Sequence, residues 1–243
     1  PPRRCHPMHD PATTQGLIQF MPKNLFERLK GACPNDWRAY TGHNFVRQLA
    51  AGSLAEASFR HYLGQDYLFL IHFARAYALA AYKATSLSEM RGAVASVDGI
   101  LNTEMALHVE YCRGWGLDEA AMTALPEANA TMAYTRFVLE CGMAGDSLDL
   151  YAALAPCVIG YGEIGTTLAA DPGTVMAGNP YASWIEMYAS DDYQGVAQGA
   201  LAQLDSLGEQ RLTSARFEAL ARTFRQATRL EADFWQMGLT LAP

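Results

Sequence analysis

Residues 53–82 read SLAEASFRHYLGQDYLFLIHFARAYALAAY, and this stretch decides the fold. Ser53 and Glu56 have the spacing of a capping box, in which a hydroxyl and a carboxylate satisfy the exposed amides at a helix start. Apolar residues then recur with helical periodicity to the end of the stretch, which predicts one long helix. His72 and Arg75 interrupt its apolar run, so we expect a core helix and not a membrane span.

Helix signals dominate the chain from Asn24 onward. Ser86 and Glu89 form a second capping box, and no alternating strand pattern or Asn-Gly or Asp-Gly turn occurs. The further helices are expected over residues 86–114, 127–141, 146–169, 190–208 and 213–238, and Asp146 or Ser147 is expected to cap the third of these. Pro156 lies inside one of them, where it removes a backbone donor and predicts a kink. The sequence therefore predicts an all-α fold, a single-domain helical bundle.

Composition narrows the function. Residues 1–20 are polar and proline-rich without the apolar run of a secretory signal, so we expect a disordered leader, a helical domain over 21–243 and a cytoplasmic location. The formal charge is −7 with scattered Lys and Arg, which argues against a nucleic-acid partner. No stretch approaches the roughly 18 apolar residues of a membrane span. The five cysteines form no CxxC pair, which predicts free thiols in a reducing compartment.

One face of the long helix carries an acid among aromatic residues. Tyr62, Asp66, Phe69 and Phe73 fall at i, i+4, i+7 and i+11 and therefore share that face. A carboxylate there is costly to bury unless something pairs with it. Either Asp66 lies at an interface edge and binds Gln65, an arginine or water, or it is aimed at the nitrogen donors of a ligand.

Cys157 directly follows Pro156 inside its predicted helix. A thiol at this place lies where freed carbonyls and slack packing can open a pocket, and Tyr161 shares its face one turn later. The alternative is a small core residue, as most lone helical cysteines are. Because Cys157 is about three turns from the helix start, its activation would need a neighbouring base.

Glu231 is a candidate proton carrier. Phe234 and Trp235 follow it at i+3 and i+4, and a carboxyl among aromatic side chains should have a raised pKa and exchange a proton near neutrality. The alternative is a solvated glutamate that pairs with a Gln or Arg a turn away. Tyr188 belongs to an aromatic group at helical spacing, which is typical of core, although its hydroxyl could enter a pocket.

Glu104-x-x-x-His108 with Glu110 has the ligand spacing of a carboxylate-bridged metal pair. Such a site needs more histidines or paired carboxylates on other helices. No histidine follows His108, and Glu163 could supply only part of a second set. A structural polar cluster is therefore favoured over a metal site.

Together these segments resemble the TenA/thiaminase II family of aminopyrimidine aminohydrolases, from about Phe45 to Gly238. The matching motifs are Gly52-Ser-Leu54, Phe59-x-x-Tyr62-x-x-Gln65-Asp66, Glu104-x-x-x-His108, Pro156-Cys157-x-x-x-Tyr161-x-Glu163, Pro180-Tyr181-x-x-Trp184 and Glu231-x-x-Phe234-Trp235. The resemblance implies a haem-oxygenase-like helical fold without haem, a homotetramer, and no metal or other cofactor.

The resemblance also implies roles for individual residues. Cys157 matches the family nucleophile, Glu231 the general acid/base and Asp66 the carboxylate that holds the pyrimidine. Contacts to the pyrimidine or the cysteine are implied for Tyr134, Tyr161 and Tyr188. Phe69 is a departure, because the family often has tyrosine there; the stacking surface remains while a hydroxyl donor is lost.

The implied reaction is hydrolysis of 4-amino-5-aminomethyl-2-methylpyrimidine to the 5-hydroxymethyl compound and ammonia, with thiamin as a possible second small-molecule substrate. A metal-dependent oxidase on the same scaffold is a rival, for which the histidines are too few. A non-catalytic pyrimidine-binding or regulatory protein is another, which the acidic composition and the lack of a DNA-reading element do not support. A haem-degrading enzyme would need an axial histidine that faces a glycine-rich helix, and no convincing pair occurs.

Overall fold

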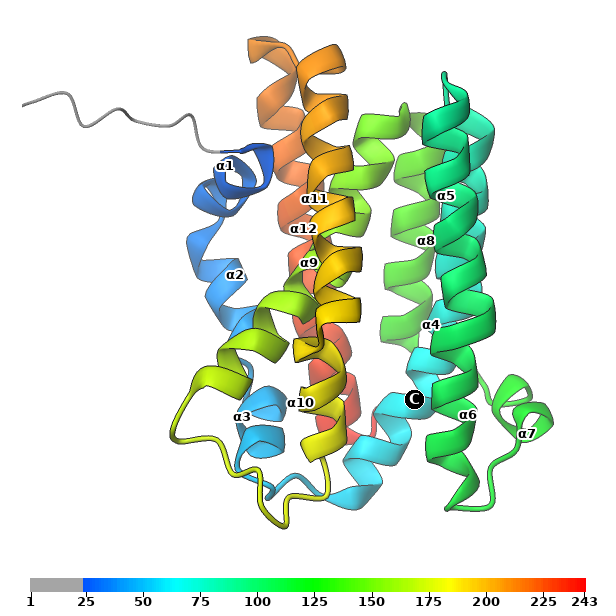
Figure 1. The fold of residues 1–243 in the computed structure, drawn as a ribbon, viewed down its shortest axis with the longest axis vertical. Helices are drawn as coiled ribbons and strands as arrows, with labels where there is room; N and C mark the ends of the chain where they lie inside the picture. Colours follow the sequence, from blue (N-terminus) through cyan, green and yellow to red (C-terminus); the bar gives the residue numbers. More distant parts are fainter. Residues whose placement is uncertain (1–23) are drawn as a thin grey trace, which may run out of the picture.

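The computed structural model describes residues 24–243 as helices joined by loops and turns (Figure 1). In chain order the helices are α1 (Leu25–Ala32), α2 (Pro34–Thr41), α3 (Asn44–Ala50), α4 (Glu56–Lys83), α5 (Leu87–Gly99), η1 (Ile100–Glu104), α6 (Met105–Arg113), α7 (Glu119–Thr123), α8 (Asn129–Ala144), α9 (Ser147–Ala170), α10 (Ala182–Ala189), α11 (Asp191–Arg211) and α12 (Ser214–Thr240). The described part contains no strand, which confirms the all-α prediction. The leader expected over residues 1–20 lies outside the described residues.

The long helices run side by side along the molecule, while α1, α2 and α3 cover one flank (Figure 1). Helix α9 packs against α4, α8, α10, α11 and α12, so most of its residues are buried. A helix surrounded in this way is apolar all round, as the sequence of α9 is. Within residues 24–243 no helix is long and apolar enough to cross a membrane.

Helix α4 begins at Glu56, so the capping box predicted at Ser53 is wrong. The backbone amide of Ser53 donates to the carbonyl of Gln48 and belongs to the turn that closes α3. Ala55 is the N-cap and makes no side-chain capping bond. The Glu56 carboxylate lies 3.9 Å from Arg60 on the next turn instead.

The predicted caps of α5 and α9 are confirmed. The Ser86 hydroxyl accepts a hydrogen bond from the Glu89 amide at the start of α5, although the Glu89 carboxylate reaches back to the amide of Thr85. Asp146 and Asp149 form a complete capping box at the start of α9. These bonds satisfy amides that have no partner within the helix, which fixes where α5 and α9 begin.

The predicted helix 86–114 contains a π turn that its cap and stop signals do not encode. Helix α5 continues through η1 into α6, and the Met105 amide donates to the carbonyl of Ile100, five residues earlier. An inserted residue rotates the following helix by about 100°. After this turn His108 is buried while its neighbour Leu107 is exposed.

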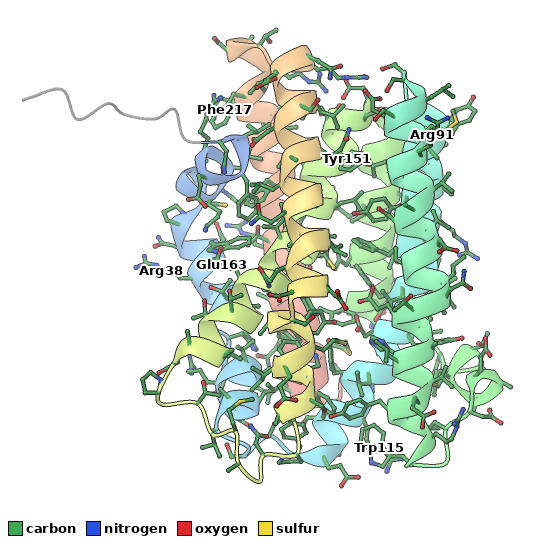
Figure 2. All side chains as sticks on the ribbon, in the orientation of Figure 1. Arg38, Arg91, Trp115, Tyr151, Glu163 and Phe217 are labelled. Carbon is green, nitrogen blue, oxygen red and sulfur yellow. The ribbon has the colours of Figure 1, made fainter. Side chains whose placement is uncertain are left out.

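The first two helices are tied to α9 through Glu163, which is labelled in Figure 2. Lys30 of α1 donates to one oxygen of its carboxylate at 2.7 Å, and the indole of Trp37 in α2 donates to the other at 2.8 Å. Glu163 follows Cys157 by six residues on the same helix. Charge-assisted bonds of this kind fix the position of α9 against the flank of the bundle.

Candidate active site

The structure brings all the predicted site residues together in the interior of the bundle. They come from five helices: Asp66 and Phe69 from α4, Tyr134 from α8, Cys157 and Tyr161 from α9, Tyr188 from α10 and Glu231 from α12. All are buried except Cys157, which is half-buried as a residue. Polar and reactive groups that converge among buried aromatic side chains are typical of a small-molecule site.

Glu231 joins Tyr134 to Cys157. The Tyr134 hydroxyl donates to Glu231 Oε1 at 2.8 Å, and the Cys157 thiol lies beside the same carboxyl. Burial raises the pKa of Glu231 from its ordinary 4.5 to about 8, against the effect of both these neighbours and with that of the Asp66 charge. With 2% of its surface exposed, Glu231 is not the solvated residue of the alternative interpretation.

The cysteine is a thiol at rest. Burial raises the pKa of Cys157 well above its ordinary value, and the negative charges of Glu231 and Asp66 raise it further. A proton passed from this thiol to the Glu231 carboxylate would leave the net charge of the pair unchanged. A carboxyl that titrates near neutrality in contact with a thiol is suited to this transfer.

Asp66 is paired with a histidine, and among residues 24–243 no glutamine or arginine side chain bonds to it. Its Oδ2 atom lies 2.6 Å from His108 Nε2, and the other ring nitrogen, Nδ1, lies 2.9 Å from the carbonyl oxygen of Glu104. Both members of the pair are buried, with 5% and 4% of their surfaces exposed. Both ring nitrogens of His108 are thus occupied by protein groups, which agrees with the polar-cluster interpretation of the Glu104-x-x-x-His108 motif.

Sequence reasoning left His108 and Tyr62 out of the site. The Tyr62 hydroxyl donates to Asp66 Oδ2 at 3.4 Å and accepts a hydrogen bond from the Trp184 indole at 3.3 Å. Tyr161 of α9 lies beside the Tyr62 hydroxyl, which brings α9 next to the Asp66 cluster. Tyr62 and Asp66 share a helix face by their spacing, but nothing in the spacing of the motifs shows that His108 reaches Asp66.

Aromatic rings form the walls around these polar groups. The Tyr161 ring lies 4.9 Å from that of Tyr188 and 5.2 Å from that of Trp235. Phe69 packs its ring 5.0 Å from that of Tyr134, so it retains a stacking surface without a hydroxyl. Rings held rigidly by such pairs suit a flat heteroaromatic ligand.

Two glycines of α9 allow these neighbours to come close. A Cβ atom on Gly160 would lie 2.6 Å from a ring carbon of Tyr40, whose hydroxyl donates to the carbonyl of Pro156 at 3.2 Å. A Cβ atom on Gly165 would lie 2.5 Å from the backbone of Tyr188. The small residues therefore let α2 and α10 pack directly on the helix that carries the cysteine.

Comparisons with known proteins identify the family of this chain. Residues 34–241 match the TENA/THI-4/PQQC family. A protein of Haemophilus influenzae is 42% identical over 218 residues, which cover 90% of this chain and 100% of the relative. An aminopyrimidine aminohydrolase of Halalkalibacterium halodurans is 36% identical over 202 residues, or 83% of this chain and 89% of the relative.

Solved structures share the fold. A TenA family transcription regulator from Silicibacter sp. TM1040 superposes with a TM-score of 0.85 at 48% identity, over 89% of this chain and 96% of that one. A domain with a heme oxygenase-like fold from Shewanella denitrificans has a TM-score of 0.68 at 13% identity, over 90% and 93% of the two chains. These similarities confirm the haem-oxygenase-like fold and the TenA resemblance, and they show that this chain belongs to the TENA/THI-4/PQQC family.

Proposed function

We propose that this chain is an aminopyrimidine aminohydrolase, a hydrolase of thiamin-pyrimidine salvage. It converts 4-amino-5-aminomethyl-2-methylpyrimidine and water into 4-amino-5-hydroxymethyl-2-methylpyrimidine and ammonia. The observation that carries the proposal is the contact of the Cys157 thiol with the buried, high-pKa carboxyl of Glu231. The similarity to an aminopyrimidine aminohydrolase over most of both chains supports the same substrate class.

The first half of the reaction forms a carbon–sulfur bond. Glu231 takes the thiol proton of Cys157, and the sulfur adds to carbon 6 of the pyrimidine. The electron pair displaced into the ring then expels the amine from the methylene at carbon 5, and Glu231 returns a proton to the departing nitrogen as ammonia leaves. Addition of the thiolate is needed because an intact aromatic pyrimidine loses this group reluctantly.

The second half restores the enzyme. Water adds to the exocyclic methylene that the first half leaves behind, and Glu231 accepts the proton that the water loses. The ring becomes aromatic again as the carbon–sulfur bond breaks, and Glu231 returns the proton to the sulfur of Cys157. One water is consumed and one ammonia is released, so atoms and charge balance over the cycle.

Asp66 and the aromatic walls bind the ring in this proposal. The Asp66 carboxylate accepts a hydrogen bond from the 4-amino group and holds that edge of the ring in place. The ring of Phe69 packs against that of Tyr134, and the ring of Tyr161 packs against that of Tyr188. Both pairs supply flat surfaces for stacking.

The test is ammonia release from the aminopyrimidine by wild type and Cys157→Ser. We expect the variant to lose at least about 10²-fold in kcat, because serine is a far weaker nucleophile in this setting. Cys141→Ser, which changes a second partly exposed cysteine on α8, is the matched control and should retain wild-type turnover. Near-full turnover by Cys157→Ser would refute the nucleophile assignment.

The same experiment separates this function from a binding protein. A thermal shift with the aminopyrimidine and no ammonia release from wild type would favour a non-catalytic pyrimidine-binding protein. A substrate panel that adds thiamin and the formylamino analogue shows which leaving groups the site accepts with phenylalanine at position 69. We propose that thiamin is cleaved as well, because stacking at Phe69 is retained although the hydroxyl is lost.

We further propose a homotetramer in the cytoplasm. The cysteines of the described residues form no disulfide with one another, as suits a reducing compartment. A strip of exposed apolar side chains along α5 and η1 supports association with further copies. It consists of Leu87, Met90, Val94 and Leu101.

A further inference from the structure

The buried pair of Asp66 and His108 has a proton arrangement that its geometry determines. His108 Nδ1 faces the carbonyl oxygen of Glu104 at 2.9 Å, and a carbonyl only accepts hydrogen bonds, so Nδ1 carries a hydrogen. In neutral imidazole the other nitrogen, Nε2, would then be a bare acceptor. It lies 2.6 Å from Asp66 Oδ2, where two acceptors without a hydrogen between them would repel.

One proton must therefore lie between Nε2 and Oδ2. The pair is an imidazolium and a carboxylate, or an imidazole and a carboxylic acid, and it is neutral in total. Burial opposes the imidazolium, but the hydrogen bond and charge of Asp66 outweigh it and raise the pKa of His108 to about 9. The imidazolium–carboxylate form is favoured at neutral pH.

The two oxygens of Asp66 are not equivalent. Within residues 24–243 both hydrogen bonds to this carboxylate, from His108 and Tyr62, end on Oδ2. The other oxygen, Oδ1, keeps its full acceptor capacity inside a site whose rings suit a flat ligand. A carboxylate held by one oxygen presents the other in a fixed direction.

We propose that His108 is a positioning residue of the active site: it anchors Oδ2 of Asp66, aims Oδ1 at the amino group of the bound pyrimidine, and keeps one proton on the pair. This inference rests on the proposed function, because the ligand it orients is the aminopyrimidine. His108 acts only through Asp66 and touches neither the substrate nor the thiol. The π turn at Ile100–Glu104 precedes His108 by one turn and, by rotating the following helix, places His108 on the face that meets Asp66.

The titratable groups that face His108 in the described part of the chain both favour the imidazolium. Asp66 approaches from α4, and Glu104 lies one turn earlier at the end of η1. Burial raises the pKa of Glu104 to about 7, so above that value its carboxylate adds a second negative charge. Deprotonation of the pair should therefore begin only as the pH approaches about 9.

A second histidine provides an internal contrast. His72 on α4 also meets a carboxylate, Glu127, at 2.9 Å. Partial burial and the nearby guanidinium groups of Arg136 and Arg75 lower the pKa of His72 in spite of that carboxylate. The two histidine–carboxylate pairs should thus hold opposite protonation states at pH 7.

The first test is a ¹⁵N NMR titration of wild-type protein with labelled histidine, from pH 5 to 10. We expect both His108 ring nitrogens to be protonated at pH 7 and to titrate near 9, while His72 is neutral. The His72 signals are assigned by their loss in His72→Asn. A neutral His108 at pH 7 would overturn the inference, and this readout does not depend on the reaction.

The second test is a double-mutant cycle in kcat/KM for the aminopyrimidine. His108→Ala should lose roughly 10- to 100-fold, as removal of a supporting partner of an active-site ligand does. In an Asp66→Asn background the same substitution should cost less than about 3-fold, because the group through which His108 acts is already changed. An equal loss in both backgrounds would show that His108 does not act through Asp66.

A conservative variant protects the test against misfolding. His108→Gln keeps an N–H that can donate to Oδ2 but cannot titrate. It should recover most of the kcat/KM lost in His108→Ala and should lack the alkaline limb near pH 9 that wild type shows with the same substrate. A pH profile of kcat/KM for His108→Gln that is identical to that of wild type would refute the proposal that His108 keeps one proton on the pair.

The failure of this inference is distinguishable from failure of the proposed function. If wild type releases no ammonia, the function fails, while the NMR titration still decides the state of the pair. If Cys157→Ser is inactive and His108→Ala retains wild-type kcat/KM, the function stands and His108 is only structural. His72→Asn, which changes a half-buried residue outside the proposed site, should remain fully active throughout.

Discussion

Glu231 shows how burial alone can change the chemistry of a common side chain. The carboxyl lies between the hydroxyl of Tyr134 and the thiol of Cys157, with 2% of its surface exposed. Loss of hydration destabilises its charged form more than these two donors stabilise it, which is why its pKa rises to about 8. A glutamate on the protein surface could not exchange protons with a thiol near neutral pH.

The first consequence is a pH profile. The base form of Glu231 appears as the pH rises through about 8, so kcat/KM for the aminopyrimidine should increase over that range. Glu231→Gln should lower kcat by about 10² to 10⁴-fold and abolish this acidic limb. Steady-state ammonia release between pH 6 and 9 measures both effects, and a limb that persists in the variant would assign it to another group.

The raised pKa of Glu231 also makes the stability of the folded chain depend on pH, and it determines the direction of that dependence. Glu231 titrates at about 8 in the folded chain and at its ordinary 4.5 when unfolded, so between these values the folded state binds more protons. Its contribution is fully present below 4.5 and is lost as the pH rises through 8. The Tm of Glu231→Gln minus that of wild type should therefore grow from pH 5 to pH 9; a constant difference would contradict the raised pKa.

At the scale of the element, neighbouring helices pack closely against the backbone of α9 on two sides. Tyr40 lies against Gly160 and bonds to the carbonyl of Pro156, and the backbone of Tyr188 lies against Gly165. The helix can carry Cys157 into the middle of the bundle because these positions lack side chains. Close packing explains the glycines at positions 160 and 165, which their spacing alone does not reveal.

Gly160→Ala tests this packing. The added methyl would overlap the buried Tyr40 ring, and overpacking of a core typically costs about 1–3 kcal/mol of unfolding free energy. Gly199→Ala, on an exposed position of α11 with no atom within 4 Å of the added carbon, should instead stabilise by up to about 1 kcal/mol. Urea unfolding distinguishes the two, and equal effects would exclude a special role for Gly160.

At the scale of the whole molecule, one outer surface is unusually apolar. Leu87, Met90 and Val94 are exposed at i, i+3 and i+7 of α5 and therefore form one strip, which Leu101 continues on η1. Exposed apolar strips of this kind mark association surfaces. The strip lies on α5 and η1, the same continuous helical segment whose π turn sets the position of His108.

Light scattering after size exclusion should give wild type a mass four times that of the 26.6 kDa chain. Met90→Lys combined with Val94→Lys should reduce that mass, because burying two ammonium groups in an apolar interface is costly. Val196→Lys, which changes an exposed apolar residue on α11, is the matched control. An unchanged tetramer in the double variant would place the interface elsewhere.

The sequence by itself determined the helical fold and the identity of the candidate residues. Caps at Ser86 and Asp146 were readable because a capping bond joins groups within one turn of each other. The resemblance located Cys157 and Glu231, although their roles remain predictions. Where a local signal competed with a neighbouring turn, as at Ser53, it failed.

Only the tertiary structure decided which residues of the site contact one another. His108 meets Asp66 across 42 residues of sequence, and Tyr134 meets Glu231 across 97. Such pairs depend on how whole helices rotate and pack, and the π turn before His108 changes that rotation without a spacing signal. Local patterns encode contacts within a turn or two, whereas burial and its effect on pKa arise only when distant helices exclude water together.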